Sequence, residues 1–144
     1  MNDLERLAIE HDCMKLMVGY CVHADHDQAD EFAAEFAALF AEDGVWVQGS
    51  GGEIRGRDAL RAYIRGRPGR TLTRHMITNL LVDVVNDNAA TGIAYALVFR
   101  DRDYDGSGGA AMRSPGSVVE YRDEFRRTPE GWKIQRRRSV AVFR

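Results

Sequence analysis

Cysteine is scarce in this chain of 144 residues, which contains only Cys13 and Cys21. The two lie eight positions apart, which in a helix is a separation of roughly 12 Å. That distance is too long for a disulfide bond. Neither residue belongs to a CxxC or CxxH pattern of the kind that binds zinc. We expect both to be reduced thiols in the core.

Long apolar runs and a targeting segment are also missing. No stretch approaches the ~18 consecutive apolar residues of a membrane-spanning helix. The first six residues lack the basic and then apolar layout of a secretory signal. We therefore expect a cytoplasmic protein with no membrane contact. Its length, with 44% hydrophobic and 29% charged residues, predicts one globular domain over residues 1–144.

The net charge is only −2, but the two parts of the chain differ. Residues 1–54 carry two basic residues against twelve acidic ones, whereas residues 55–144 carry eighteen basic residues against ten acidic ones. Only residues 136–138 form a basic run, and no nucleic-acid-binding motif accompanies it. The pattern favours attraction between an acidic helical layer and a basic sheet, so we expect no nucleic-acid partner.

The hydrophobic periodicity changes along the chain from helical to strand-like. Three helices are expected first: residues 4–23, a second helix that Asp27 caps and Asp43–Gly44 ends, and residues 58–65. After a short strand at residues 45–47, four long strands are expected at residues 71–85, 89–102, 117–127 and 132–143. This order predicts an α+β fold, in which three helices cover a strongly curved, antiparallel sheet and enclose a cone with a pocket.

Five short motifs occur in a fixed order along the chain. They are ADHD at 24–27, LFAEDGV at 39–45, IRGR at 54–57, RHMITN at 74–79 and GWKI at 131–134. With the order of elements, they resemble the SnoaL-like branch of the nuclear transport factor two superfamily over nearly the whole chain. The resemblance implies a cystatin-like half-barrel with an antiparallel or mixed sheet. That superfamily includes scytalone dehydratase, ketosteroid isomerase, polyketide cyclases and hexachlorocyclohexane dehydrochlorinase, so its fold serves several reactions.

The resemblance places a catalytic dyad at Asp25 and His75. A carboxylate that is bonded to one ring nitrogen fixes the histidine tautomer, so the other nitrogen can remove a proton. The plainer alternative is that Asp25 ends the first helix and His75 is an interior histidine. A metal site of His23, Asp25, His26 and Asp27 is a further alternative, but the ligands would have to converge from one short turn. We expect no metal and no cofactor.

Further residues are candidates for binding a substrate. The chain has Ala24 where scytalone dehydratase carries a tyrosine, so another group must polarise the substrate. The candidates are Tyr20, Tyr63, Asn79 and Arg137, which lies nearest to a functional arginine of the dehydrochlorinase. Asn79 lies four residues after His75, and strand alternation predicts that both share one face. Trp46, Tyr95 and Phe99 are expected to form an aromatic lining.

The resemblance implies a cofactor-independent lyase or isomerase of the dehydratase type. Its substrate would be a small hydrophobic molecule, cyclic or aromatic, and His75 would act as the base. The alternative is a non-catalytic ligand-binding or assembly module, related to the small subunit of ring-hydroxylating dioxygenases. In either case we expect a homodimer or homotrimer, with the outer face of the sheet as the contact.

Overall fold

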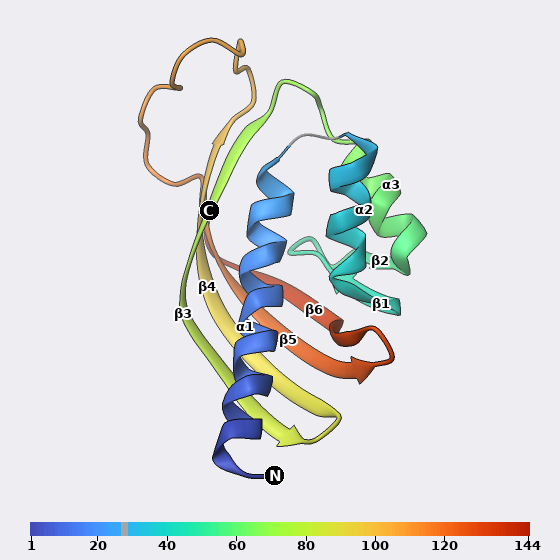
Figure 1. Ribbon diagram of the computed structural model, residues 1–144. Helices are drawn as coiled ribbons and strands as arrows, with labels where there is room; N and C mark the ends of the chain where they lie inside the picture. Colours follow the sequence, from blue (N-terminus) through green and yellow to red (C-terminus); the bar gives the residue numbers. More distant parts are fainter. Residues whose placement is uncertain (27–28) are drawn as a thin grey trace.

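The computed structural model describes residues 1–26 and 29–144. In these residues three helices cover one face of a six-stranded sheet that is not closed into a barrel (Figure 1). The strands are β1 (Phe40–Val47), β2 (Glu53–Arg55), β3 (Leu72–Asn86), β4 (Ala89–Asp101), β5 (Ser117–Thr128) and β6 (Gly131–Phe143). Their order across the sheet is β2-β1-β6-β5-β4-β3. The expected α+β fold is therefore confirmed.

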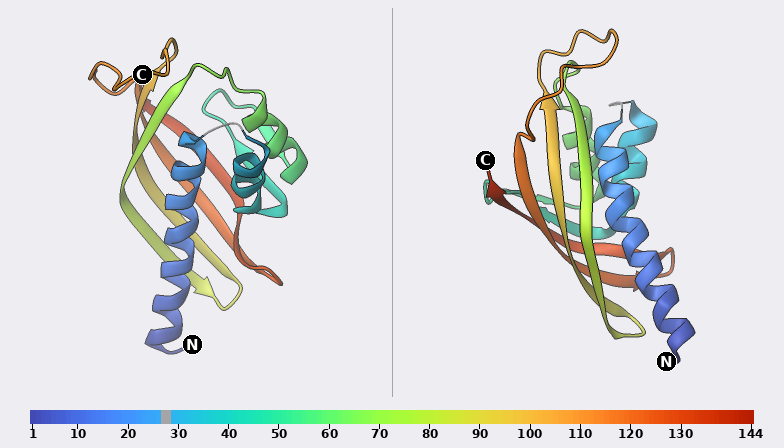
Figure 2. Two further views of the ribbon diagram at one scale, coloured as in Figure 1. Left: turned by 45° about the horizontal axis from the view of Figure 1, so that its top comes forward. Right: turned by 90° about the vertical axis from the view of Figure 1, so that its left-hand side faces the viewer.

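The sheet consists of two long antiparallel hairpins that pair through β4 and β5, a short antiparallel β1–β2 pair and one parallel contact. β3 pairs with β4, β4 with β5 and β5 with β6, all antiparallel, whereas β1 runs parallel to β6. The four long strands bend together around the helices, as the side view in Figure 2 shows. The sheet is thus mixed and strongly curved, and its concave face receives the helices.

The first helix, α1 (Asp3–Asp25), lies along this concave face (Figures 1 and 2). Asn2 starts it with a capping box, in which the Asn2 side chain accepts from the Glu5 backbone and Glu5 accepts from the Asn2 backbone. Cys13 and Cys21 are both buried free thiols on this helix, as their spacing predicts. The helix ends at Asp25, so the predicted catalytic carboxylate stands at its last position.

The second helix is shorter than the sequence predicts. It runs as α2 (Asp30–Ala38), and the chain enters β1 at Phe40, so Asp43–Gly44 lies within a strand and does not end the helix. The segment forms a strand and does not continue the helix, because the Ile134 backbone N–H donates to the Leu39 carbonyl oxygen and joins this segment to β6. The expected cap, Asp27, lies outside the described residues.

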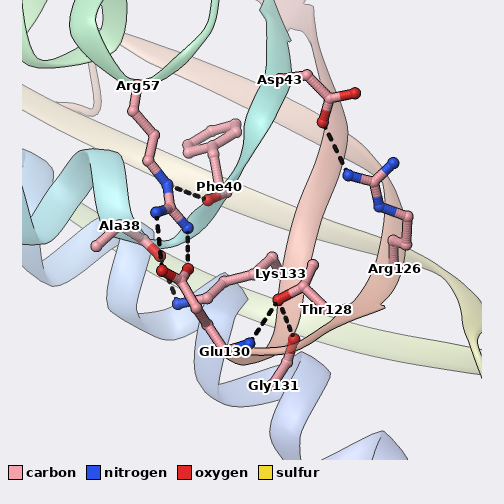
Figure 3. Close-up of polar contacts among 9 residues, drawn as sticks. All are labelled: Ala38, Phe40, Asp43, Arg57, Arg126, Thr128, Glu130, Gly131 and Lys133. Atoms are coloured by element: carbon pink, nitrogen blue, oxygen red, sulfur yellow. Dashed lines mark hydrogen bonds and ion pairs between the residues drawn. The ribbon is translucent and has the colours of Figure 1, made fainter.

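A polar cluster fixes the second and third helices to the turn between β5 and β6 (Figure 3). Arg57 opens α3 (Arg57–Arg65), donates to the Phe40 carbonyl oxygen and forms an ion pair with Glu130 in that turn. Lys133 donates to the carbonyl oxygen of Ala38 at the C-terminal end of α2. A cation is favourable there because helix carbonyl groups give that end a partial negative charge.

Aromatic and aliphatic side chains from the helices and the sheet fill the space between them. Tyr20 lies at the centre, with ring centroids 5.1 Å from Phe36, 5.4 Å from Tyr121 and 5.7 Å from Trp46. The core therefore continues directly into the walls of the site described next. In the described part of the chain, none of the helices is long and apolar enough to cross a bilayer.

Candidate active site

The site is built where the end of α1 meets the start of β3. Asp25 is the last residue of α1, and Thr73 and His75 are inward-facing residues of β3. In a strand, every second residue faces the same side, so Thr73 and His75 point together toward the helix. The local folds therefore bring a carboxylate and an imidazole together although they are fifty residues apart in sequence.

The Asp25 carboxylate accepts three hydrogen bonds from β3. His75 Nδ1 lies 2.5 Å from Asp25 Oδ1, and the His75 backbone N–H donates to Oδ2 over 2.6 Å. The Thr73 hydroxyl donates to Oδ1 over 2.9 Å. The exposed fractions of the Asp25 and His75 side chains are 6% and 10%. The contact predicted between Asp25 and His75 is present, and it is shielded from solvent.

These bonds decide the protonation of the pair. Burial acts to raise the pKa of Asp25, but the hydrogen bonds from His75 and Thr73 and the charge of His75 outweigh it, so the pKa lies below its ordinary value. The carboxylate is therefore ionised near neutral pH and can only accept. Nδ1 of His75 must then carry a hydrogen, so Nε2 is the ring nitrogen that can accept a proton when the imidazole is uncharged.

His75 forms part of the wall of a cavity of about 290 Å³ between the helices and the concave face. Most of its walls are aromatic or aliphatic, formed by Tyr20, Phe36, Trp46, Tyr63, Ile64, Val98, Val119 and Tyr121. The polar part consists of His75, Gln48, Ser50, Arg67, Arg100, Ser117 and Ser139. The cavity can thus hold a small, mainly apolar molecule with the imidazole on one side.

Three of the predicted binding residues line this cavity. Tyr20 comes from α1, Trp46 from β1 and Tyr63 from α3. The rings of Trp46 and Tyr63 meet edge to face, with centroids 5.1 Å apart, and the Trp46 indole N–H donates to the Ser139 hydroxyl over 2.9 Å. Of the expected aromatic lining, Trp46 is therefore in place, and two of the candidate polarising residues, Tyr20 and Tyr63, add further aromatic walls.

The placement of Tyr95 and Phe99 in the cavity is wrong. On β4 the buried residues Ala94, Ala96 and Val98 face inward, so the alternate positions of Tyr95 and Phe99 face outward. Phe99 borders a different hollow, of about 390 Å³, on the far side of the sheet beneath residues 110–114. Both faces of β4 are apolar, and this pattern alone did not show which one faces inward.

The expectation that Asn79 shares the face of His75 is also wrong, because a β-bulge separates them. Thr78 is opposite Tyr95 and Leu81 is opposite Ile93, so two residues of β3 stand opposite the single residue Ala94. Asn79 adopts a left-handed conformation, with φ of 53°, and its side chain is exposed. Asparagine tolerates this conformation better than most residues. The bulge shifts the alternation by one residue, and Asn79 does not line the cavity.

Arg137 lies behind the cavity wall and is completely buried. It forms a bidentate ion pair with Asp123 on β5, with N–O distances of 2.7 and 2.5 Å. Its guanidinium carbon is 4.1 Å from the ring centroid of Tyr20 and 4.4 Å from that of Tyr121. Both rings line the cavity, so Arg137 supports two wall residues and is not itself among the lining residues.

Sequence reasoning missed Thr73, Asp123, Arg67 and Arg100. A usable signal existed for Asp123, because it lies between Tyr121 and Phe125 at alternate positions of a strand. A carboxylate at an inward position of such a strand needs a buried partner. Thr73 could have been found in the same way, two residues before His75.

The histidines beside Asp25 have other contacts. His23 Nδ1 lies 3.3 Å from a carboxylate oxygen of Glu35, and His26 stacks on the Phe32 ring. Within residues 1–26 and 29–144, no three His, Cys, Asp or Glu side chains are grouped as metal ligands would be. Asp27, the fourth member of the alternative metal cluster, lies outside the described residues.

Comparison with known proteins gives one family and many similar structures. The family model described as SnoaL-like domain matches residues 5–138. No curated protein matches the chain. Among solved structures, an NTF2-like protein with a cystatin-like fold from Novosphingobium aromaticivorans is 27% identical, with a TM-score of 0.76 over 96% of this chain and 85% of that chain.

Two other similar structures carry enzyme names. A candidate scytalone dehydratase from Novosphingobium aromaticivorans is 23% identical, with a TM-score of 0.76 over 96% of this chain and 87% of that chain. Hexachlorocyclohexane dehydrochlorinase LinA-type3 from Novosphingobium barchaimii is 18% identical, with a TM-score of 0.75 over 99% and 92%. At these identities the likeness shows the cystatin-like fold, which hosts several chemistries.

Proposed function

Because the chain belongs to the SnoaL-like domain family, whose fold it shares with a dehydrochlorinase, we propose that it is a cofactor-independent lyase or isomerase. His75 is its base, and the substrate is a small hydrophobic molecule that is cyclic or aromatic. The observation that carries this proposal is the buried Asp25–His75 contact at the wall of an apolar cavity. A base is useful only where a substrate can reach it, and His75 lines the cavity while its partner stands behind it.

The proposed reaction begins with proton removal. Nε2 of His75 accepts a proton from a C–H bond next to a carbonyl group, and the electron pair of that bond moves toward the carbonyl oxygen to form an enolate. In an isomerisation the imidazolium returns the proton to another carbon. In an elimination the electron pair forms a carbon–carbon double bond and expels hydroxide or halide. A departing hydroxide then takes the imidazolium proton and leaves as water, whereas after halide loss the imidazolium releases its proton to solvent.

Two residues assist this step in distinct ways. Asp25 keeps Nδ1 protonated and stabilises the positive ring after proton transfer. Burial raises the pKa of Tyr20 well above its ordinary value, despite the opposing effect of Arg137, so the hydroxyl stays protonated. A protonated hydroxyl in the cavity wall can donate a hydrogen bond to a substrate oxygen on which negative charge develops. Tyr20 is therefore our candidate for the polarising group.

Hydrogen–deuterium exchange tests the base without knowledge of the leaving group. Small cyclic ketones such as indanone and tetralone are incubated with the protein in deuterium oxide, and loss of the α-proton signal is followed by NMR. We expect wild type to accelerate exchange for at least one ketone and His75→Gln to lose about 10²–10⁴-fold of that acceleration. The matched control is Tyr95→Phe on the outer face, which should exchange like wild type. Equal exchange by wild type and His75→Gln would overturn the proposed role of His75.

A second candidate function, an assembly module, is favoured by the outer face of the sheet. Met76, Leu97, Val118 and Phe143 are successive partners across β3, β4, β5 and β6, and the exposed fractions of Met76 and Phe143 are 58% and 66%. A row of this kind fits a second copy of the chain as a homodimer or homotrimer. Sedimentation velocity of wild type and Leu97→Glu tests this. Wild type should sediment as an oligomer and the variant as a monomer, and a monomeric wild type would refute self-association.

A further inference from the structure

The end of the cavity that holds the dyad carries two arginines, and the proposed reaction uses neither of them. Arg67 follows α3, and Arg100 lies near the end of β4. Both line the cavity together with His75. In the described part of the chain, neither guanidinium lies within 4.0 Å of a carboxylate, whereas Arg57, Arg61 and Arg137 each do.

Both arginines are placed beside the dyad by contacts of the backbone. Arg67 Nη1 donates to the carbonyl oxygen of Ala24, the residue before Asp25, over 2.5 Å. Arg100 is the register partner of Thr73, whose hydroxyl donates to Asp25. Val98, the register partner of His75, also lines the cavity, and Arg100 is two residues further along the same face of β4. The two cations therefore lie at the end of the cavity where His75 forms part of the wall.

No carboxylate of the described residues offsets this charge inside the cavity. The lining residues include neither Asp nor Glu. Asp25, which is bonded to the lining residue His75, already accepts three hydrogen bonds from Thr73 and His75. The rest of the polar wall consists of serine hydroxyl groups and the Gln48 amide, which are neutral. The cavity thus combines an apolar interior with a positively charged end.

We propose that the ligand of this cavity is a hydrophobic carboxylate, with its apolar part against Trp46 and Tyr63 and its carboxylate held by Arg67 and Arg100. Guanidinium groups are suited to this because their planar N–H pairs match the geometry of a carboxylate. Arg67 uses one N–H for Ala24, and an arginine has five. This inference rests on the proposed site and names its substrate class. The cavity should favour a carboxylate over a neutral ketone or halocarbon of similar shape.

Binding of matched pairs tests the inference. Isothermal titration calorimetry compares three aromatic carboxylates with their neutral amides: benzoate with benzamide, cinnamate with cinnamamide, and naphthoate with naphthamide. The members of each pair have nearly the same shape and differ in charge. For the best-fitting pair we expect wild type to bind the carboxylate about tenfold more tightly or better, since hydrogen bonds to charged groups are stronger than neutral ones.

Variants assign the preference to the two arginines. Arg100→Gln should reduce it to within about threefold, and Arg67→Lys should weaken it while keeping a donor for Ala24. Arg127→Gln removes the same charge from an exposed position on β5 outside the cavity and should leave the preference unchanged. Circular dichroism confirms that each variant is folded. If Arg67→Lys is unfolded, Arg100→Gln decides alone, because its side chain is exposed and removing it leaves no buried gap.

The two proposals fail in different ways. If every amide binds as tightly as its carboxylate, or if the preference survives in Arg100→Gln, the carboxylate inference is wrong whatever the exchange experiment shows. The preference should persist in His75→Gln, because it arises from the arginines and not from a charged imidazole. Loss of the preference in that variant would assign anion binding to His75 and overturn the role of the arginines. A preserved preference without proton exchange in wild type would refute only the proposed catalysis.

Discussion

His75 is bonded to Asp25 at two points, through ring Nδ1 to Oδ1 and through its backbone N–H to Oδ2. One carboxylate therefore fixes both the imidazole and the strand that carries it. Thr73 adds a third bond from the same strand. Asp25 joins the end of α1 to β3, so its chemical role and its structural role cannot be removed separately by one substitution.

Asp25→Asn should impair the base and also destabilise the fold. The amide can present N–H to the ring and select the wrong tautomer, so we expect proton exchange to fall by about 10²–10⁴-fold. Thr73→Val is the control, because it removes one bond to Asp25 and leaves the dyad. Its exchange rate should stay close to that of wild type. If both variants lose the same fraction of activity, Asp25 acts through the position of β3 and not through the imidazole.

The stability of wild type relative to Asp25→Asn should depend on pH. The pKa of Asp25 is lower in the folded protein than its ordinary value of 3.8, so the folded state favours the ionised form. That stabilisation is complete above the ordinary pKa and is lost as the pH falls through the folded-state pKa. Urea unfolding between about pH 7 and pH 2 measures it. The free-energy difference between the two proteins should be constant near neutrality and shrink in acid, and growth in acid would contradict the assignment.

Asp123→Ala should be strongly destabilising because it leaves the buried guanidinium of Arg137 without its ion-pair partner. The Arg137 and Asp123 side chains are both 0% exposed, and the attraction of Asp123 keeps the pKa of Arg137 above its ordinary value although burial opposes it. Breaking a buried ion pair by removing one partner costs about 3–5 kcal/mol. The double variant Arg137→Met/Asp123→Leu leaves no charge behind and should recover most of that loss. Chemical denaturation measures both values, and equal stability of the single and double variants would contradict this account.

The two thiols should be unreactive in the folded protein. Burial is the main factor that raises the pKa of Cys13 and Cys21 to about 12, so almost no thiolate is present at neutral pH. Ellman's reagent should react with neither cysteine in native protein and with both after unfolding. Rapid modification of either thiol under native conditions would show that α1 opens locally, since Cys13 and Cys21 are 0% and 3% exposed.

Local sequence patterns predicted the elements better than their ends and faces. The long strands and α1 follow from periodicity, but the shift from α2 to β1 depends on a backbone bond between Leu39 and Ile134, which are distant in sequence. Tyr95 was misplaced because Ala94 and Ala96, the small inward residues of β4, carry less apolar signal than their outward neighbours. Such errors arise because tertiary packing decides which of two apolar faces is buried.

The site was predictable to the extent that family resemblance supplied it. Periodicity alone would not pair Asp25 with His75, because neither residue belongs to a spacing motif that names the other. The polar partners that complete the site, Thr73 and the two arginines, meet the dyad only through strand register and the path of the chain after α3. Strand register depends on bulges, which a single residue can introduce.

The bulge at Asn79 divides β3 into two parts with different surroundings. Before the bulge, Thr73 and His75 are hydrogen-bonded to Asp25, and after it Leu80, Val82 and Val84 pack into the core. Deleting Asn79 would remove the bulge and leave Leu80 opposite Ala94 and Leu81 opposite Ile93, so the lower strand would keep its inward face. The bulge therefore lets β3 hold one extra residue without changing which of its side chains below Asn79 face the core.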